Sequence, residues 1–263
     1  MKLLNVLLCK FDYKMTYHKF LVLCVVLLGF SCNSFDKALT AEDIINNAII
    51  KHCGTACDNS TIIFSFRDKT YKSIKKEGAY QYERSFSDSL HHIKDVLTNT
   101  GFERYVNDTI LELPEPLKLK YANAVNSVHY FAQLPYGLNA QAVNKQLLGE
   151  AIIKGKHYYE IGVTFNEAGG GTDFEDKFVY WINKADFSLD YLAYSYAVNG
   201  GGIRFREAYN KRTVNNITFL DYNNYKPETL DVALTDLDEL FKVGKLKLMS
   251  KIETENIDVI LNP

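Results

Sequence analysis

Hydrophobic residues in the first part of the chain change from a helical period to an alternating one. Ile45 and Ala48 share one face of a helix that the spacing predicts over residues 41–52, with Thr40 as its N-cap. From Thr61 onward, apolar side chains alternate with polar ones in short segments separated by glycine or asparagine turns. This alternation predicts an antiparallel meander. Its expected strands are residues 61–67, 70–74, 79–86, 91–97, 102–106 and 109–113.

The second half of the chain begins with a longer helix and returns to short strands. A helical stripe from Leu117 to Phe131 predicts a helix that ends near Pro135, followed by an irregular arm over 136–148. A further amphipathic stretch is expected at 236–243. The expected strands are residues 151–153, 157–165, 177–183, 187–198, 202–209, 216–222 and, last, 246–252.

Two of these strands, 177–183 and 187–198, are apolar on both faces. Such a strand is either buried on both sides or lines a cavity with one face. The composition agrees with a sheet protein, because the chain has 18 Tyr and 16 Phe but 5 Pro, and aromatic residues favour strands. The predicted class is therefore α+β, mainly antiparallel β, with residues 41–263 as a single domain.

The charge and the motifs exclude several classes of function. A formal net charge of −2 is too balanced for a protein that binds nucleic acid by neutralising phosphates. The sequence contains no HExxH, no GxSxG, no phosphate loop and no EF-hand spacing, so we expect no cofactor, no metal and no catalytic residues. The glycine-rich segment 169–176 predicts a hairpin loop with solvated acids, and a calcium site is the weaker alternative.

The N-terminus has the features of an export signal. The apolar run 20–30 follows several lysines and is too short to span a bilayer, which is typical of a signal peptide over residues 1–31, with Met15 as an alternative start. Its end resembles the bacterial lipobox, which implies that Cys32 is lipidated and that 32–40 is a tether. Simple cleavage near Ser31 is the alternative. The expected partner is thus a membrane, through a lipid anchor in the cell envelope.

Two cysteines remain in the mature chain, Cys53 and Cys57. Outside the cytoplasm a close pair favours a small disulfide over two free thiols. Their three-residue spacer differs from that of a thioredoxin-like redox pair. Zinc binding by His52 and both thiols is a weaker alternative, because the sequence has no second cluster of ligands.

Arg204 and Arg206 alternate with apolar residues and therefore share one face of a predicted strand. If that face looks into a cavity, the two guanidinium groups could hold a carboxylate or a phosphate. If it looks outward, they are surface charges or pair with Glu83, Glu103 or Asp221.

Four segments, 121–149, 174–183, 190–210 and 219–227, resemble a family of uncharacterised lipoproteins from Bacteroidota. The family brings no established activity. Some members carry an aldolase name, but that aldolase is a (β/α)₈ barrel, and the alternation of parallel strands and helices that such a barrel needs is absent here.

The order of elements is similar to that of the lipoprotein-carrier (LolA-like) half barrel. The resemblance implies a strongly curved antiparallel sheet whose apolar concave face is covered by helices. It implies an amphiphilic ligand, namely an acyl chain, a lipid or a lipoprotein, and no catalysis. The residues expected to line the cavity are Tyr180, Ile182, Tyr191, Tyr194 and Tyr196, with Arg204 or Arg206 near a head group.

Two alternatives remain at this stage. One is an interaction or scaffold protein whose half barrel is filled by its own side chains. The other is an envelope hydrolase, which would need a nucleophile and a base brought together by the fold.

Overall fold

The computed structural model describes residues 38–262 except 170, 172 and 173. From Leu39 onward the chain forms one compact unit. The predicted signal peptide, the lipidated Cys32 and most of the tether lie outside the described residues. Among the helices described, none is long and apolar enough to cross a membrane.

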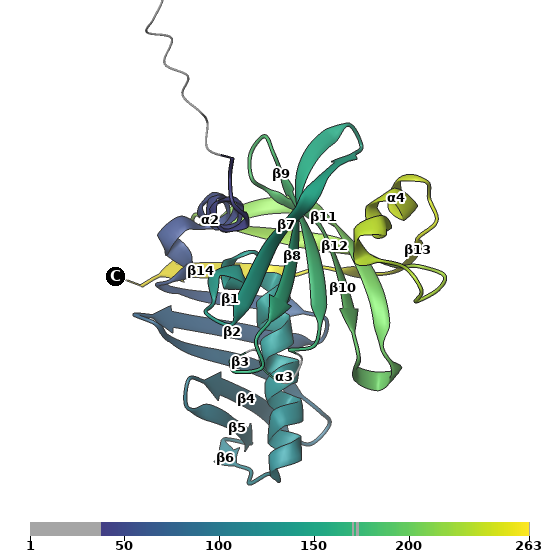
Figure 1. The fold of residues 1–263 in the computed structure, drawn as a ribbon. Helices are drawn as coiled ribbons and strands as arrows, with labels where there is room; N and C mark the ends of the chain where they lie inside the picture. Colours follow the sequence, from purple (N-terminus) through teal and green to yellow (C-terminus); the bar gives the residue numbers. More distant parts are fainter. Residues whose placement is uncertain (1–37, 170, 172–173, 263) are drawn as a thin grey trace, which may run out of the picture. The chain divides into compact units, whose positions relative to one another are not determined.

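The strands form two antiparallel sheets of seven strands each (Figure 1). Sheet A has the order β14-β1-β2-β3-β4-β5-β6, and sheet B the order β13-β12-β11-β10-β9-β8-β7. The strands of sheet A are β1 (Ser60–Phe66), β2 (Lys69–Lys76), β3 (Ala79–Ser87), β4 (His92–Thr98), β5 (Gly101–Val106), β6 (Thr109–Ile110) and β14 (Glu255–Leu261). Those of sheet B are β7 (Val143–Ile153), β8 (Lys156–Phe165), β9 (Lys177–Asn183), β10 (Leu189–Tyr196), β11 (Gly202–Val214), β12 (Ile217–Lys226) and β13 (Lys247–Ile252).

Two predictions about the strands were wrong. The segment 136–148 is not an irregular arm, because a short 3₁₀ helix, η2 (Tyr136–Asn139), leads directly into the edge strand β7. A β-bulge between Leu147 and Gly149 interrupts the alternation on which the prediction relied. Strand 246–252 is not the last, since β14 follows it and pairs with β1.

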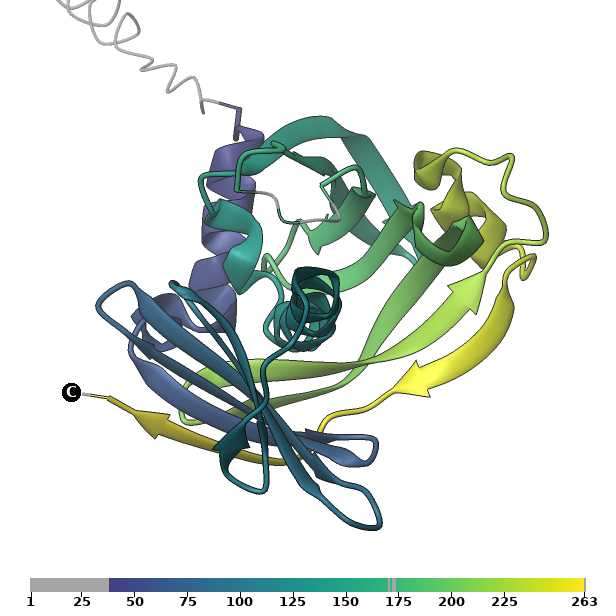
Figure 2. The same ribbon diagram turned by 90° about the horizontal axis from the view of Figure 1, so that it is seen from below.

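Among the described residues, three α-helices complete the fold: α2 (Ala41–His52), α3 (Glu115–Ala132) and α4 (Leu237–Lys242). The predicted cap of α2 is confirmed, because the Asp43 N–H donates to Thr40 Oγ1 at 3.1 Å and the Thr40 N–H donates to the Asp43 carboxylate at 2.9 Å. Seen from below, α3 lies between the two sheets, inside their curvature (Figure 2). The predicted class, mainly antiparallel β with strongly curved sheets and covering helices, is confirmed.

The central strands of sheet B are buried on both faces along much of their length. Its inner face, which carries Tyr180 and Ile182, belongs to the same core as α2 and α3. Its outer face, which carries Trp181 and Phe205, packs against Phe241 of α4. The continuous apolarity of β9 and β10 therefore reflects burial on both sides.

Candidate functional site

The inner face of sheet B changes character along its strands. Toward one end of β9 it is closed, because Tyr180 and Ile182 have no exposed surface. The hydroxyls of Tyr180 and Tyr130 of α3 are hydrogen-bonded to each other at 2.8 Å, and burial raises the pKa of both phenols. At this position the helix fills the space that the sequence prediction assigned to a ligand.

Farther along the same face, five side chains are half-buried and reach solvent. We call this set the aromatic–arginine site; it comprises Phe178, Tyr194, Tyr196, Arg204 and Arg206. The rings of Phe178 and Tyr194 stack with centroids 5.4 Å apart, and Tyr196 lies 6.0 Å beyond Tyr194. Strand pairing sets this arrangement, since Tyr194 faces Phe178 on β9 and Arg204 on β11.

Each arginine of the site is held by a tyrosine. Arg206 Nη2 donates to the Tyr194 hydroxyl at 2.9 Å, and Arg204 Nη2 donates to the Tyr196 hydroxyl at 2.7 Å. Gly202 makes room for the Tyr196 ring, because a Cβ at this position would come within 2.5 Å of the phenolic oxygen. The two guanidinium groups are thus positioned before any ligand arrives.

Arg206 sits among aromatic rings. Its guanidinium carbon lies 5.3 Å from the ring centre of Phe131, 5.0 Å from that of Tyr194 and 5.9 Å from that of Tyr222. A guanidinium is attracted to the faces of such rings. Its Nη2 is already hydrogen-bonded to Tyr194, and its remaining N–H groups can donate to an anion.

Three other arginines of this fold pair with carboxylates. Arg84 and Arg104 both donate to the fully buried Asp95, with Nε–O distances of 3.0 and 2.6 Å. Arg212 pairs with Asp221 at 3.0 Å. Within the described part of the chain, Arg204 and Arg206 form no ion pair, so the predicted alternative of pairing with Glu83, Glu103 or Asp221 does not describe them.

Two buried polar atoms, one in the site and one beside it, have no hydrogen-bond partners among the described residues. These are Arg206 Nε, a donor, and Asn224 Oδ1, an acceptor. The two residues are direct partners in the pairing of β11 with β12 and therefore share the inner face. A buried donor or acceptor left unpaired costs about 1–3 kcal/mol. A polar ligand or a bound water would remove this cost.

Tyr191 does not join the other predicted lining residues. It lies on the outer face of sheet B, where its ring is 5.8 Å from Phe205 and 5.7 Å from Phe241. Successive strand residues point to opposite faces, so Tyr191 and Tyr194, three positions apart, cannot share one.

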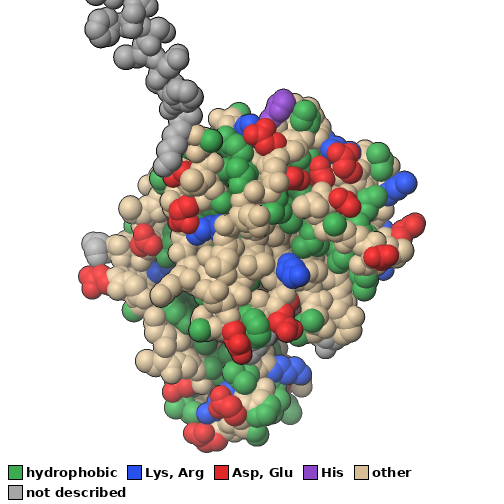
Figure 3. All heavy atoms as spheres, viewed as in Figure 1, with side chains coloured by type: hydrophobic (Ala, Val, Ile, Leu, Met, Phe, Trp, Pro, Cys, Tyr) green, Lys and Arg blue, Asp and Glu red, His purple; other side chains and the backbone are tan. Residues whose placement is uncertain are grey.

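A separate cavity is lined by strands of sheet A. It is an open groove of about 510 Å³ at the end of sheet A that carries β5 and β6. Its walls are mostly polar and carry charges of both signs, including Lys94, Glu103 and Lys118. Acidic and basic side chains are likewise interspersed on the surface that Figure 3 shows. Phe102 and Tyr105 are its aromatic residues, and they stand among charged side chains rather than in a continuous aromatic lining.

The two remaining cysteines lie at the end of α2. Cys53 is the C-cap of the helix, and Cys57 ends the 3₁₀ helix η1 (Gly54–Cys57). The structure joins them in a disulfide whose Cα atoms are 5.7 Å apart. Neighbouring His52 is buried, and burial lowers its pKa to about 3, so its imidazole is neutral.

Sequence reasoning missed one residue of the site, Phe178, and two that border it, Phe131 and Asn224. Phe178 could have been found, because it precedes Tyr180 by two positions and therefore shares its face. Phe131 was recognised only as part of a helical stripe, and Asn224 carries no local signal. Their roles depend on α3 and β12 packing next to β11.

Comparison with known proteins places the chain in a family. The sequence profile of a "Family of unknown function (DUF6503)" matches residues 17–254. The chain belongs to this family. The match agrees with the predicted resemblance to a family without an established activity. Among curated proteins, none matches this chain.

Several solved structures are similar to this DUF6503 protein. A LolA superfamily protein from Nitrosomonas europaea has a TM-score of 0.47 and 14% identity, covering 86% of this chain and 95% of its own. An outer membrane lipoprotein-sorting protein domain from Vibrio parahaemolyticus has a TM-score of 0.39 and 10% identity, covering 76% and 98%. The lipoprotein LppX of Mycobacterium tuberculosis has a TM-score of 0.27 and 12% identity, covering 60% and 91%.

Proposed function

We propose that this protein binds an amphiphile with an acidic head group at the aromatic–arginine site, without catalysis, and that a lipid on Cys32 holds it in the cell envelope. The observation that carries the proposal is Arg206. Its charge is half-buried among rings, it has no carboxylate partner among the described residues, and its Nε lacks an acceptor. A carboxylate or phosphate would supply both the charge and the acceptor.

The aromatic side chains supply the apolar half of the proposed site. Phe178, Tyr194 and Tyr196 form a row of rings along the same face, with part of each ring open to solvent. Rigid aromatic rings bury much apolar surface and lose little rotamer entropy when an acyl chain lies against them. Tyr180 and Ile182 support this row from the packed end of the face.

A second candidate is an interaction protein with a self-filled interior. Its support is the packing of Tyr180 beneath Tyr130, which leaves no space for a chain at that end of the face. In this case the aromatic–arginine site would contact a partner protein through the same rings and charges.

Competition binding tests the proposal. A fluorescent long-chain fatty acid bound to the purified protein is displaced by palmitate or by hexadecanol, which share a chain length and differ in the charge of the head group. We expect Arg206→Met to weaken palmitate binding about tenfold or more, because a hydrogen bond to a charged group contributes about 1.5–3 kcal/mol. Hexadecanol binding should stay unchanged.

The matched control is Lys177→Met, which removes a positive charge from an exposed position of β9 next to Phe178. It should leave both affinities as in the wild type. Equal palmitate affinity in the wild type and in Arg206→Met would show that Arg206 does not bind the head group. If the purified protein binds no probe at all, the result favours the second candidate, an interaction protein with a self-filled interior.

A further inference from the structure

The end of α2 brings three metal-binding side chains together. The ligand atoms of His52, Cys53 and Cys57 all lie within 4.8 Å of one another, and all three side chains are buried. The chain supplies them from the last residue of α2, its C-cap and the end of η1. Because the three residues lie on adjacent turns, they can bind one ion together without any change in the sheets.

A second observation concerns His52. Its Nε2 atom is buried and has no hydrogen-bond partner among the described residues. Most buried polar side-chain atoms in proteins are hydrogen-bonded, so an unpaired imidazole nitrogen calls for an explanation. Imidazole nitrogen and cysteine sulfur are the ligands that soft cations such as Cu(I), and also zinc, prefer.

We propose that reduction of the Cys53–Cys57 disulfide converts this cluster into a three-ligand site for a soft, monovalent cation, with cuprous ion as the chemistry that fits best. Thiolate ligands select Cu(I), whereas zinc would need a fourth ligand beyond the three buried side chains that this cluster offers among the described residues. This site is separate from the aromatic–arginine site and does not depend on the proposed function.

Reduction of the disulfide requires a two-electron donor. A dithiol donor transfers two electrons and two protons to the disulfide, which gives two thiols, and the donor itself becomes a disulfide. The thiols then lose their protons to solvent as their sulfurs bind the cation, which keeps its oxidation state. With metal–sulfur distances of about 2.3 Å, ligand atoms on one ion lie up to about 4.6 Å apart. The His52 nitrogen lies within 4.8 Å of both sulfurs, and the sulfurs, which are bonded to each other in the structure, can both bind one ion only after reduction lets them move apart.

Anaerobic titration with Cu(I) tests the proposal. The full chain also contains Cys9, Cys24 and Cys32, which are replaced by serine in every sample. The protein is reduced with a phosphine, freed of it, and titrated with Cu(I) in competition with a chromogenic Cu(I) chelator. We expect the reduced protein to bind one equivalent, with a thiolate-to-copper band in the near ultraviolet, and the oxidised protein to bind none.

Two variants and a control assign the ligands. His52→Gln should weaken Cu(I) binding at least tenfold, and Cys57→Ser should abolish it. His157→Gln, at an exposed position, should leave it unchanged. His52→Gln keeps both cysteines, so it decides the matter even where Cys57→Ser fails to fold. Equal binding by the reduced and oxidised proteins, or wild-type affinity in His52→Gln, would overturn the site. Tighter binding of Zn²⁺ than of Cu(I) would overturn the choice of ion.

Discussion

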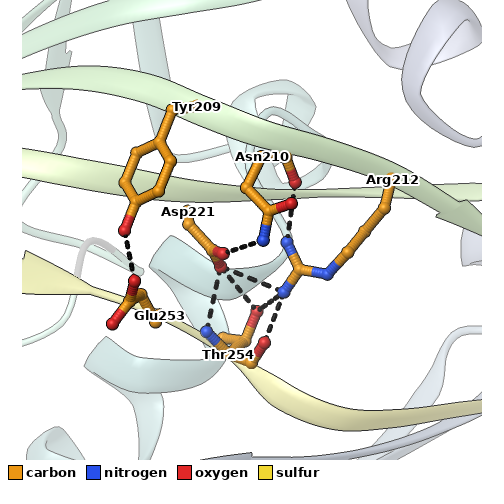
Figure 4. A network of polar contacts seen from close by, with 6 residues as sticks. All are labelled: Tyr209, Asn210, Arg212, Asp221, Glu253 and Thr254. Carbon is orange, nitrogen blue, oxygen red and sulfur yellow. Dashed lines mark hydrogen bonds and ion pairs between the residues drawn. The ribbon is translucent and has the colours of Figure 1, made fainter.

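The Asp221 carboxylate accepts a hydrogen bond from the backbone N–H of Thr254 at 3.0 Å, where the chain passes from sheet B to sheet A (Figure 4). Asp221 lies on β12, and Thr254 lies between β13 and β14. The same carboxylate accepts hydrogen bonds from Asn210 at 2.6 Å and from Arg212 at 3.0 Å. Arg212 also donates to the Thr254 backbone carbonyl. A buried charge network therefore fixes the crossing between the sheets.

Asp221→Ala should destabilise the protein by about 3–5 kcal/mol, because it leaves Arg212 half-buried without its counter-charge. Urea unfolding followed by circular dichroism measures the change. Glu253→Ala is the control: it removes only the surface hydrogen bond to Tyr209 and should cost less than about 0.5 kcal/mol. Similar midpoints for the two variants would mean that the network does not stabilise the crossing.

Asp95 on sheet A holds two arginines at once. Asp95→Asn preserves the shape of the side chain but removes the charge that Arg84 and Arg104 share, so we expect a loss of about 3–5 kcal/mol in the free energy of unfolding. Asp108→Asn, at an exposed turn, is the control. A loss no greater than that of the control would show that the two arginines find other partners.

The hydroxyls of Tyr130 and Tyr180 bond each other, so the stability losses of the two single variants should not add up in the double variant. Each single change to Phe leaves one buried hydroxyl unpaired and should cost about 1–3 kcal/mol. The double variant removes both hydroxyls and should cost clearly less than the sum of the two. Tyr105→Phe, whose hydroxyl bonds Glu103 at the surface, should have little effect. Additive losses would show that the pair does not act as a unit.

The buried amine of Lys75 should make the free energy of unfolding rise with pH. It is buried, donates to Gln133 Oε1 at 2.6 Å and lies 3.7 Å from the centre of the Tyr136 ring. Burial lowers its pKa from 10.5 to about 7. Between these values the unfolded chain holds a proton that the folded protein has released. The free energy of unfolding should therefore rise by up to about 1.4 kcal/mol per pH unit from pH 7 to 9.

Lys75→Met should flatten this rise, because the variant carries no titrating amine at the position. Guanidinium unfolding at pH 7, 8 and 9 gives the comparison. Lys76→Met, at the exposed neighbouring position, should keep the wild-type slope. A wild-type slope in Lys75→Met would assign the pH dependence to other groups.

Much of the fold follows from local patterns in the sequence. The helix over 41–52, its Thr40 cap and most strands were predicted from periods of 3.6 and 2, which depend only on neighbours along the chain. The burial of β9 and β10 on both faces was one of two alternatives, and the sequence could not choose between them. The choice depended on α3 and α4 packing against opposite faces.

The tertiary structure alone decided which arginines pair with a carboxylate. Arg84, Arg104, Arg204 and Arg206 all stand in strands next to aromatic residues, so they look alike in sequence. The register of β3, β4 and β5 places Asp95 between the first two, whereas the register of β10 and β11 places tyrosines beside the others. Pairing between strands is non-local. The sequence by itself therefore determined where the arginines lie along their strands, and only the packed sheets decided which of them lack a carboxylate partner.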